Sequence, residues 1–371
     1  MYIILAIVFV IPALVGWLLK SRLGTGPVWV LTVSSACLVI GCLLNLSTDI
    51  FFYLPGAGFI TAGAVLALLM FLEFGVLQFV GLFRLGALTR ITYYEGLLQP
   101  LTLILLICGI LSILMFAFMP FFTLNEDSKM YRDVAVSLVF LFTLPVMIYA
   151  STKVIDEDIE NRTMLILMSK PIARWQVVLG KYLGVLLLCF AMIVSMGMVA
   201  GVCAHFRYFD DMRLDYYVAT GAQRLQLDID NLKAALTLEP ALLLQFLQIA
   251  TLAAVSVAVS TRWGLAVNVT TVILLYIAAN LARYAVNLDL PGPLNGLTTV
   301  VAHLLPGLGY LDLNQRLIYG QFNYKLGDQV AGLPTYGQIW QYTCMAAVYA
   351  VLYISAALSF GVAAFRTREL V

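Results

Sequence analysis

One stretch of the chain gathers side chains that could bind a metal ion. Between residues 192 and 205 lie several soft ligands: Met192, Met196, Met198, Cys203 and His205. Thioether, thiolate and imidazole groups suit Cu(I), and a four-residue spacing places Met192 and Met196 on one face of a predicted helix. However, methionine is a common filler in apolar helices, and the other histidine, His303, is distant in sequence. We therefore predict packing here and no metal site, with a copper site as the alternative.

A second group of chemically reactive residues follows directly. Asp210 and Asp211 stand beside Arg207 and Arg213, and such a cluster could serve a periplasmic or intramembrane enzyme. No His–acid cluster or nucleophile motif accompanies them, as acid–base or covalent catalysis would require. A solvated, charged loop explains the same residues. The sequence therefore predicts no catalytic residue, and a membrane enzyme that acts on lipid or glycan is the less favoured alternative.

Nucleotide-binding motifs are absent from the sequence. It contains no GxxxxGK[ST] phosphate loop and no LSGGQ-like signature, and the LGKY at 179–182 lacks the first glycine of such a loop. We therefore expect no ATP to bind to this chain by that route. Ionisable residues deep in the apolar runs are scarce, with Glu73 near Gln78 as the main exception. Secondary transporters usually carry such residues, so their scarcity favours energy supplied from outside the membrane.

The composition indicates what kind of scaffold holds these residues. Of the 371 residues, 62% are hydrophobic and 11% are charged, and the net charge is +1. Soluble domains are nearer half apolar and a quarter charged. Since backbone groups must find partners within lipid, long apolar runs form helices, and we predict an all-α, polytopic helical membrane protein. The charge balance gives no sign of a nucleic-acid partner, and the six cysteines form no disulfide framework.

Apolar runs long enough to span a bilayer, about 20 residues each, predict about nine transmembrane helices. They fall at about 3–20, 28–47, 57–83, 101–120, 134–152, 177–204, 241–260, 264–286 and 339–363. The first run is followed, not preceded, by basic residues, so we expect a retained helix and no signal peptide.

Basic residues of the short loops fall on one side when nine helices are threaded alternately. They are Lys20, Arg22, Arg84, Arg90, Lys153, Arg162, Lys170, Arg174, Lys181, Arg262, Arg366 and Arg368. The positive-inside rule makes that side cytoplasmic. We therefore expect an integral protein of a bacterial-type cytoplasmic (inner) membrane, with its N-terminus outside and its C-terminus in the cytoplasm. Outer segments then lie at about 205–240, which has an amphipathic pattern, and about 287–338, which suits an interfacial or re-entrant segment.

Residues 84–100, RLGALTRITYYEGLLQP, combine charged, aromatic and apolar side chains. Arg90 and Glu95 alternate with leucine and isoleucine, and Tyr93 and Tyr94 suit the level of the lipid headgroups. We predict a cytoplasmic interfacial helix, of the elbow type, that leads into the next span.

The densest cluster of charged residues in the chain lies between two predicted spans. It consists of Asp156, Glu157, Asp158 and Glu160. An apolar run at 164–168 follows, and Pro171 disfavours helical geometry at Lys170. We predict a short amphipathic helix at 156–170 whose acidic first turn gains about 0.3–1 kcal/mol per group from the helix dipole. Such a helix commonly packs into a groove on a partner, and a solvated turn is the plainer alternative.

The stretch DEDIENRTMLILMSKPIARWQVVLGKYLG, from Asp156 to Gly184, resembles a loop of ABC-2 type transporter permeases. It is most similar to the subgroup of copper-enzyme-maturation permeases. In that pattern an acid precedes a threonine, a leucine-rich stretch, a Pro-x-x-Arg turn and a Gly-Lys at the start of the next helix. The matching residues are Glu157, Glu160, Arg162, Thr163, Leu165, Leu167, Pro171, Arg174, Gly180, Lys181 and Gly184. The resemblance runs from about Arg84 to the C-terminus, and outside the loop it is mainly one of topology.

The resemblance implies that a coupling loop at 153–176 docks into a separate ABC ATPase subunit. Its expected contact residues are Asp156, Glu157, Glu160, Arg162, Thr163, Leu165, Pro171 and Arg174. The residues expected to hold helices at the lipid headgroups, or to let them pack closely, are Arg90, Glu95, Gly180, Lys181 and Gly184. The resemblance also implies export, ATP and Mg bound by the partner ATPase, and pairing with a second permease copy or a sister permease.

The resemblance divides the chain into three parts. Residues 1–83 form a three-helix membrane extension, 84–100 the interfacial helix, and 101–371 an ABC-2-like six-helix core. The extension and the long 205–240 segment depart from the minimal pattern and would suit an accessory subunit or a special substrate. A structural or regulatory membrane subunit that translocates nothing is the first alternative to a transporter.

Overall fold

The computed structural model describes most of the chain beyond residue 83. The described residues are 84–119, 121, 127–160, 174–221, 223–224, 226–227, 231, 238–285, 305–312 and 336–366. Their helices are α5 (Arg84–Leu98), α6 (Pro100–Phe118), α7 (Asp127–Glu160), α9 (Arg174–Asp211), α10 (Arg213–Val218), α12 (Leu238–Ser260), α13 (Leu265–Ala285), α15 (Leu308–Leu311) and α17 (Tyr336–Arg366). Every regular element described is a helix, which confirms the predicted fold class.

Five of these helices are long and apolar enough to cross a membrane: α6, α7, α9, α12 and α17. The sixth predicted core helix is α13, whose apolar part, Leu265–Leu281, is shorter. The predicted extension at 1–83, with Glu73, lies outside the described residues.

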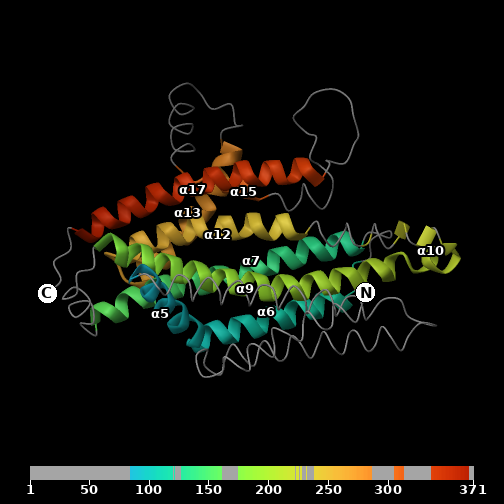
Figure 1. Cartoon of the computed structure of the whole chain (residues 1–371), viewed down its shortest axis with the longest axis horizontal. Coiled ribbons are helices and arrows are strands. Elements are labelled where there is room, and N and C mark those ends of the chain that lie inside the picture. The colour runs from blue at the N-terminus through green and yellow to red at the C-terminus, as the bar shows by residue number, and fades with distance from the viewer. Residues whose placement is uncertain are drawn as a thin grey trace.

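The long helices lie side by side along the longest axis of the molecule (Figure 1). The helix α12 lies at the centre and packs against α7, α9, α13 and α17. Its side chains are buried almost all round, as expected for a helix with no polar face. We call one end of the bundle the loop end, where α7 finishes at Glu160 and α9 begins at Arg174. The hairpin end is the opposite one, where α6 finishes and α7 begins.

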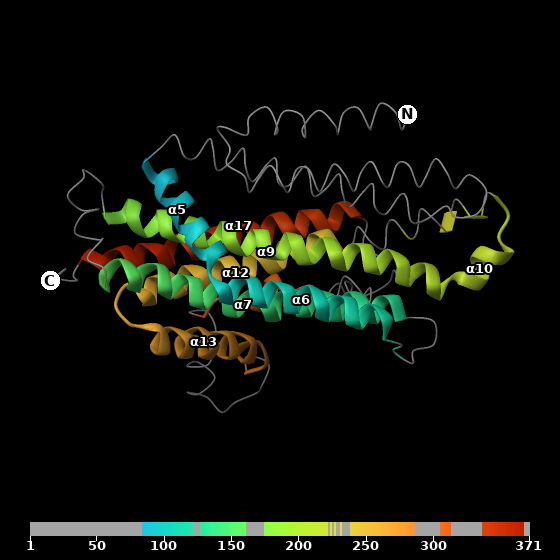
Figure 2. The same cartoon turned by 90° about the horizontal axis from the view of Figure 1, so that it is seen from below.

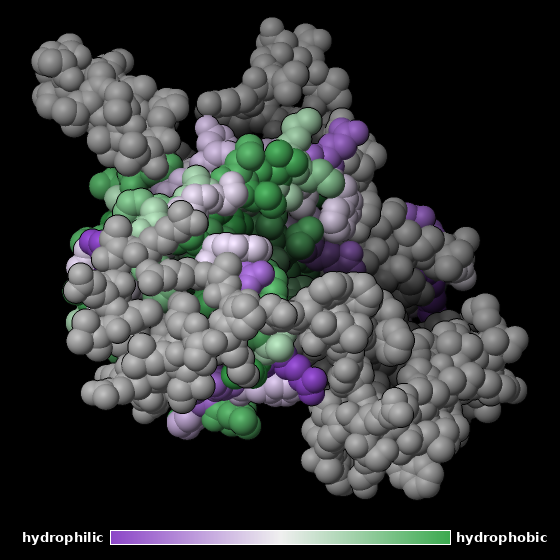
Figure 3. All heavy atoms as spheres, turned by 60° about the vertical axis from the view of Figure 1, so that its left-hand side comes forward, coloured by the Kyte–Doolittle hydropathy of each residue, from purple (hydrophilic) through white to green (hydrophobic). Residues whose placement is uncertain are grey.

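The outer surfaces of the bundle are apolar. Exposed large side chains of α6, α13 and α17 include Ile104, Ile107, Leu111, Ile273, Leu274, Ile277, Val348, Val351 and Leu352. Figure 3 shows apolar surface of this kind beside the atoms drawn in grey. A soluble protein rarely exposes so much contiguous apolar surface, whereas lipid solvates it. These helices therefore belong to an integral membrane protein.

The chain turns sharply between α5 and α6, as Pro100 requires. Gln99 is extended, with φ −67° and ψ 130°, because proline disfavours helical geometry in the residue before it. Proline is well tolerated at the first position of the following helix. The Thr102 hydroxyl donates to the Gly96 carbonyl at 2.9 Å and joins the two helices. The segment predicted to be interfacial contains α5, which leads directly into the span α6, and its position at the membrane interface stays a prediction.

Two predicted boundaries differ from those observed. α9 continues to Asp211, so the first residues of the predicted outer segment at 205–240 extend a span. α7 continues to Glu160, with Pro145 inside it. From the 287–338 segment the structure describes 305–312 and 336–338. Leu308 and Leu311 of α15 are buried in the bundle, and residues 336–338 begin α17.

Candidate functional site

The predicted coupling residues sit where α7 and α9 meet the loop end. The backbone of Asp156, Glu157 and Glu160 forms the last turns of α7, and Arg174 begins α9. Both helix ends lie at the same end of the bundle (Figure 1). Four further predicted residues, at 162, 163, 165 and 171, lie outside the described residues: Arg162, Thr163, Leu165 and Pro171.

The prediction that the acidic residues begin a separate helix at 156–170 is wrong. Asp156 to Glu160 continue α7, a single helix of 34 residues that starts at Asp127. These acids therefore do not begin a helix, and the stabilisation that a helix N-terminus gives to negative charge does not apply to them. The sequence pattern did not distinguish a continued helix from a new one, because the same apolar side chains suit the end of one helix and the start of another. Helix stability does not explain the cluster.

A buried polar knot ties α7 to α12 and α13 near the loop end. The Asn268 side-chain nitrogen donates to the Thr152 hydroxyl at 2.7 Å and to the Ser256 hydroxyl at 2.8 Å. All three residues are 0% exposed. We call these three residues the Asn268 knot. Because Thr152 lies one turn before the acidic residues, the knot fixes the helix segment that carries them.

Other contacts bring α12 close to α9 and α17 towards the same end. The Tyr182 hydroxyl of α9 donates to the Ala250 carbonyl of α12 at 3.2 Å. A Cβ on Gly361 of α17 would stand 3.0 Å from the Cα of Ala258. Arg262, in the turn after α12, donates from Nε to the Ala364 carbonyl at 3.4 Å. The helix ends that flank the predicted coupling loop thus form one connected assembly.

The helices α5 and α9 cross at a seam of glycines, as predicted for Gly180 and Gly184. A Cβ on Gly184 would lie 2.5 Å from the Thr92 Cβ and 2.9 Å from the Thr89 carbonyl oxygen. A Cβ on Gly180 would meet Leu88 at 2.9 Å, and one on Gly96 would meet Leu188 at 2.7 Å. Only glycine lets the two backbones approach this closely. Gly180 and Gly184 therefore lie where α5 and α9 pack closely.

The predicted anchoring residues have different surroundings. The Arg90 guanidinium lies over the Tyr94 ring, 5.7 Å from its centroid, and Glu95 is exposed. Lys181 is only 2% exposed, so its predicted place at the lipid headgroups is wrong. Tyr93 is likewise buried. Both sit on helix faces that the glycine seam draws into the bundle.

A charged clamp occupies the hairpin end. Arg207 of α9 forms an ion pair with Asp127 of α7 at 2.8 Å and donates to the carbonyls of Ala117 and Met119 at 3.3 and 3.0 Å. These carbonyls end α6, where orphan acceptors need a donor. The Asp211 carboxylate accepts from the Ser128 backbone amide at 2.6 Å, which caps the first turn of α7. These contacts fasten a helical hairpin and give Arg207 and Asp211 a structural role.

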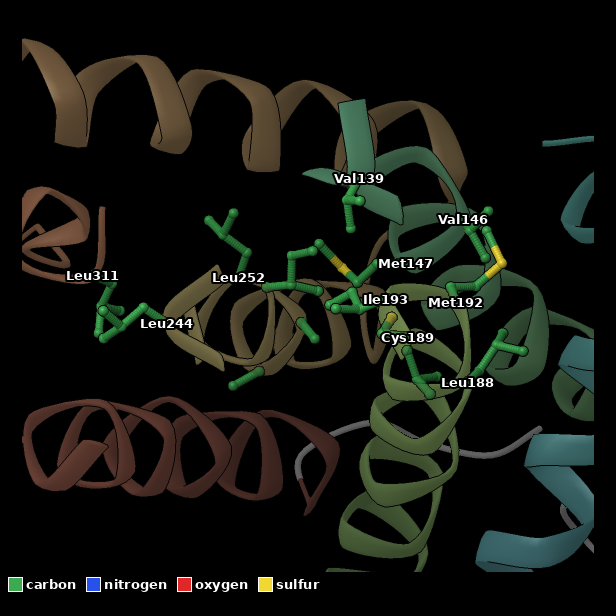
Figure 4. Close-up of a cluster of buried hydrophobic side chains, with 14 of the residues drawn as sticks. Val139, Val146, Met147, Leu188, Cys189, Met192, Ile193, Leu244, Leu252 and Leu311 are labelled. Carbon is green, nitrogen blue, oxygen red and sulfur yellow. The ribbon is translucent and has the colours of Figure 1, made fainter. Parts of the chain in front are cut away.

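Of the potential metal ligands between 192 and 205, Met192 and Met196 pack in the apolar core. Met192 and Met196 are buried, and Figure 4 shows Met192 among Val146, Leu188 and Ile193 in the apolar cluster. The end of the Met196 side chain occupies the space where a Cβ on Gly109 of α6 would lie. Among the described residues no group of three His, Cys, Asp or Glu side chains could hold a metal ion.

The sequence pattern predicted neither the Asn268 knot nor the partners of Arg207. Both join residues that are far apart in the chain, so no local pattern reveals them. One signal was available for the knot, because an asparagine inside an apolar run must hydrogen-bond to another helix or to its own backbone. The sequence did not predict the ion pair of Arg207, because its apolar pattern does not show that α9 continues to Asp211.

The family described as ABC-2 family transporter protein matches residues 34–370 of the chain. The match covers most of the chain and begins well before Arg84, where the motif resemblance begins. No curated protein matches the chain.

Proposed function

This chain belongs to the ABC-2 family of transporter proteins, and from that premise we propose how it is driven. The family consists of the membrane subunits of ABC transporters, which work with an ABC ATPase subunit and are not generally catalytic themselves. In our proposal, the 153–176 segment docks on a separate ATPase, and α7 carries its movement into the bundle. ATP and Mg bind to that partner.

The continuity of α7 carries this proposal. One helix of 34 residues joins the acidic residues to the hairpin end, so a push at Glu160 acts directly on a membrane span. The Asn268 knot then passes the displacement to α12 and α13, because Asn268 holds hydroxyls of both α7 and α12. Neutral hydrogen bonds between membrane helices contribute only about 0.6 kcal/mol on average, so such a knot can be rearranged during a transport cycle.

The position of the acids supports a protein partner. Four carboxylates within five residues of one helix repel one another, and a positively charged groove on a partner would offset that repulsion. The basic residues of the described core support the expected orientation. Arg84 begins α5, Arg262 follows α12 and Arg366 ends α17. These helix ends lie on the loop side of the bundle (Figure 1), and the positive-inside rule makes that side cytoplasmic.

The remaining features of the proposal follow the family pattern. The permease exports its substrate, it resides in a bacterial-type inner membrane, and two permease subunits pair to match two ATPase subunits. The second permease is either a copy of this chain or a sister protein. An accessory subunit would bind at the N-terminal helices or at the outer segments.

The test is purification of the chain from native membranes in mild detergent, with identification of the proteins that co-purify. We expect an ATPase with phosphate-loop and signature motifs to accompany the wild type. Glu160→Arg and Thr163→Asp should each lose it, while Asp215→Arg, a matched change in α10 at the opposite end, should keep it. If no such ATPase co-purifies, or if all variants behave alike, the loop is only topogenic and the alternative of a non-translocating subunit is favoured.

A further inference from the structure

A cavity of about 480 Å³ opens on the side of the bundle between α7, α12, α13 and the residue after α15. This volume is typical of sites that hold small molecules. Figure 2 shows α13 lying to one side of the other long helices. The lining residues from α7 fall between 133 and 144, so the cavity lies in the hairpin half of the membrane region, away from the predicted ATPase contact.

The cavity wall is apolar on one side and rich in hydrogen-bond acceptors on the other. Leu138, Leu141 and Leu144 of α7 supply aliphatic surface. Phe140 and Tyr276 add two aromatic rings whose centroids are 5.3 Å apart. An amphiphile with a hydrocarbon chain would find both kinds of contact along this wall.

The polar lining of the cavity includes two carboxylates, two amides and the hydroxyl of Ser137. Asp133 and Asp312 line it together with Gln245 and Gln248, and the glutamines stand three residues apart on one face of α12. Among the described lining residues there is no lysine or arginine. Asp133 is half-buried and Asp312 is exposed, and each carboxylate oxygen can accept more than one hydrogen bond.

Gln245 places a buried acceptor at this wall. Its side chain is 8% exposed, and its nitrogen donates to the Val136 carbonyl at 2.7 Å. The buried Oε1 of the same amide accepts no hydrogen bond in the part of the chain that the structure describes. A buried acceptor without a donor is destabilising, and a ligand that brings an N–H group would satisfy it.

We propose that this cavity binds a protonated amine on a hydrocarbon chain. The carboxylates and the Gln245 oxygen accept from the ammonium group, the aromatic rings attract its charge, and the leucines hold the chain. The inference deepens the proposed transport function by naming a substrate class and rests on it for the role of the bound molecule. The amine could be a soluble amphiphile or the headgroup of an amino lipid.

The test is photolabelling of the full chain in lipid nanodiscs with a long-chain primary amine that carries a diazirine. We expect labelled peptides from α7 and α12, with labelling reduced at least tenfold by excess dodecylamine but not by dodecanol. Nanodiscs of phosphatidylcholine, which has no N–H donor, are compared with nanodiscs that contain phosphatidylethanolamine. Competition by the second lipid identifies a membrane source, and competition only by dodecylamine identifies a soluble one.

Three variants probe the site. Gln245→Leu and Asp133→Asn remove acceptors, and Leu141→Trp fills the cavity from an exposed position without touching a polar group. Each should lower specific labelling at least fivefold, whereas Asp215→Asn, an exposed acid in α10, should not. Size-exclusion profiles show whether each variant is folded. If dodecanol competes as well as dodecylamine, or if labelling persists in a folded Leu141→Trp variant, the probe only partitions into lipid and the proposal is overturned.

The outcome is separable from that of the proposed function. If the ATPase co-purifies but amine-specific labelling is absent, the substrate class is wrong and the permease assignment stands. If labelling is specific but no ATPase co-purifies, the cavity stands and the proposed coupling is wrong.

Discussion

At the hairpin end, α6, α7 and α9 are joined by charged groups, whereas near the loop end α7, α12 and α13 are joined by neutral ones. The Arg207–Asp127 pair remains slightly open to solvent, with side chains 12% and 17% exposed. The Asn268 knot is closed to solvent completely. Charges need partial hydration or several partners, so they sit where a helical hairpin emerges from the apolar core, and amide and hydroxyl groups suffice inside it.

The difference assigns separate mechanical roles to the two ends. Breaking a buried ion pair leaves an uncompensated charge and costs about 3–5 kcal/mol, so the hairpin end holds its arrangement. Exchanging neutral hydrogen bonds within a membrane costs about 0.6 kcal/mol on average, so the loop end can move. A transporter driven from its loop end needs this asymmetry: a movable end at the ATPase and a fixed end at the far side.

The largest effect is expected from Arg207→Ala. The change leaves Asp127 without its ion-pair partner and removes the donor to the Ala117 and Met119 carbonyls. Because the pair is not fully buried, we expect the free energy of unfolding to fall by about 2–4 kcal/mol. Denaturant titration in detergent measures it. Arg213→Ala, an exposed arginine at the start of α10, should change it by less than about 0.5 kcal/mol, and equal losses would contradict the clamp.

A somewhat smaller effect is expected from Gly184→Ala. The new methyl group would stand 2.9 Å from the Thr89 carbonyl oxygen, so α5 must shift away from α9. Overpacking of this kind costs about 1–3 kcal/mol. The control is Gly201→Ala on the same helix, where nothing lies within 4 Å of the new Cβ, and that change should be neutral or stabilising. If both variants unfold at the same denaturant concentration, the seam does not hold α5.

The smallest stability effect is expected from Asn268→Leu. The knot loses two hydrogen bonds to Thr152 and Ser256, and membrane hydrogen bonds contribute about 0.6 to 1.7 kcal/mol. The loss should appear in unfolding titrations together with faster hydrogen exchange at the start of α13. Asn280→Leu is the matched control, because that asparagine bonds to Tyr276 of its own helix. If Asn280→Leu lowers the free energy of unfolding more than Asn268→Leu does, the knot does not stabilise the bundle as described.

The sequence was sufficient for the helices and insufficient for the contacts between them. Apolar runs predicted α6, α9, α12 and α17 because burial in lipid demands the same apolar length from every span. The same runs hid the continuity of α7, since Asp156 and Glu160 look alike at the end of one helix or the start of the next. Gly184 was predictable as a packing residue because small residues in membrane helices are enriched where two helices approach closely.

Lys181 shows why the rest of the site was not predictable. Its place after a glycine near a helix start suggested the lipid headgroups, yet it is only 2% exposed, in a helix that packs against α5, α7 and α12. Which face of a helix is buried depends on its neighbours, and a single sequence does not name them. The Asn268 knot and the Arg207 clamp depend on three-helix arrangements in the same way.

The most direct test of the central claim is site-specific photo-crosslinking in living cells. A photoreactive amino acid is placed at Glu160, at the end of α7, and in a second strain at Asp215, in α10 at the opposite end of the bundle (Figure 1). The account predicts that Glu160 is crosslinked to an ATPase with phosphate-loop and signature motifs and that Asp215 is not. An ATPase crosslinked equally at both positions, or at neither, would contradict coupling through the loop end.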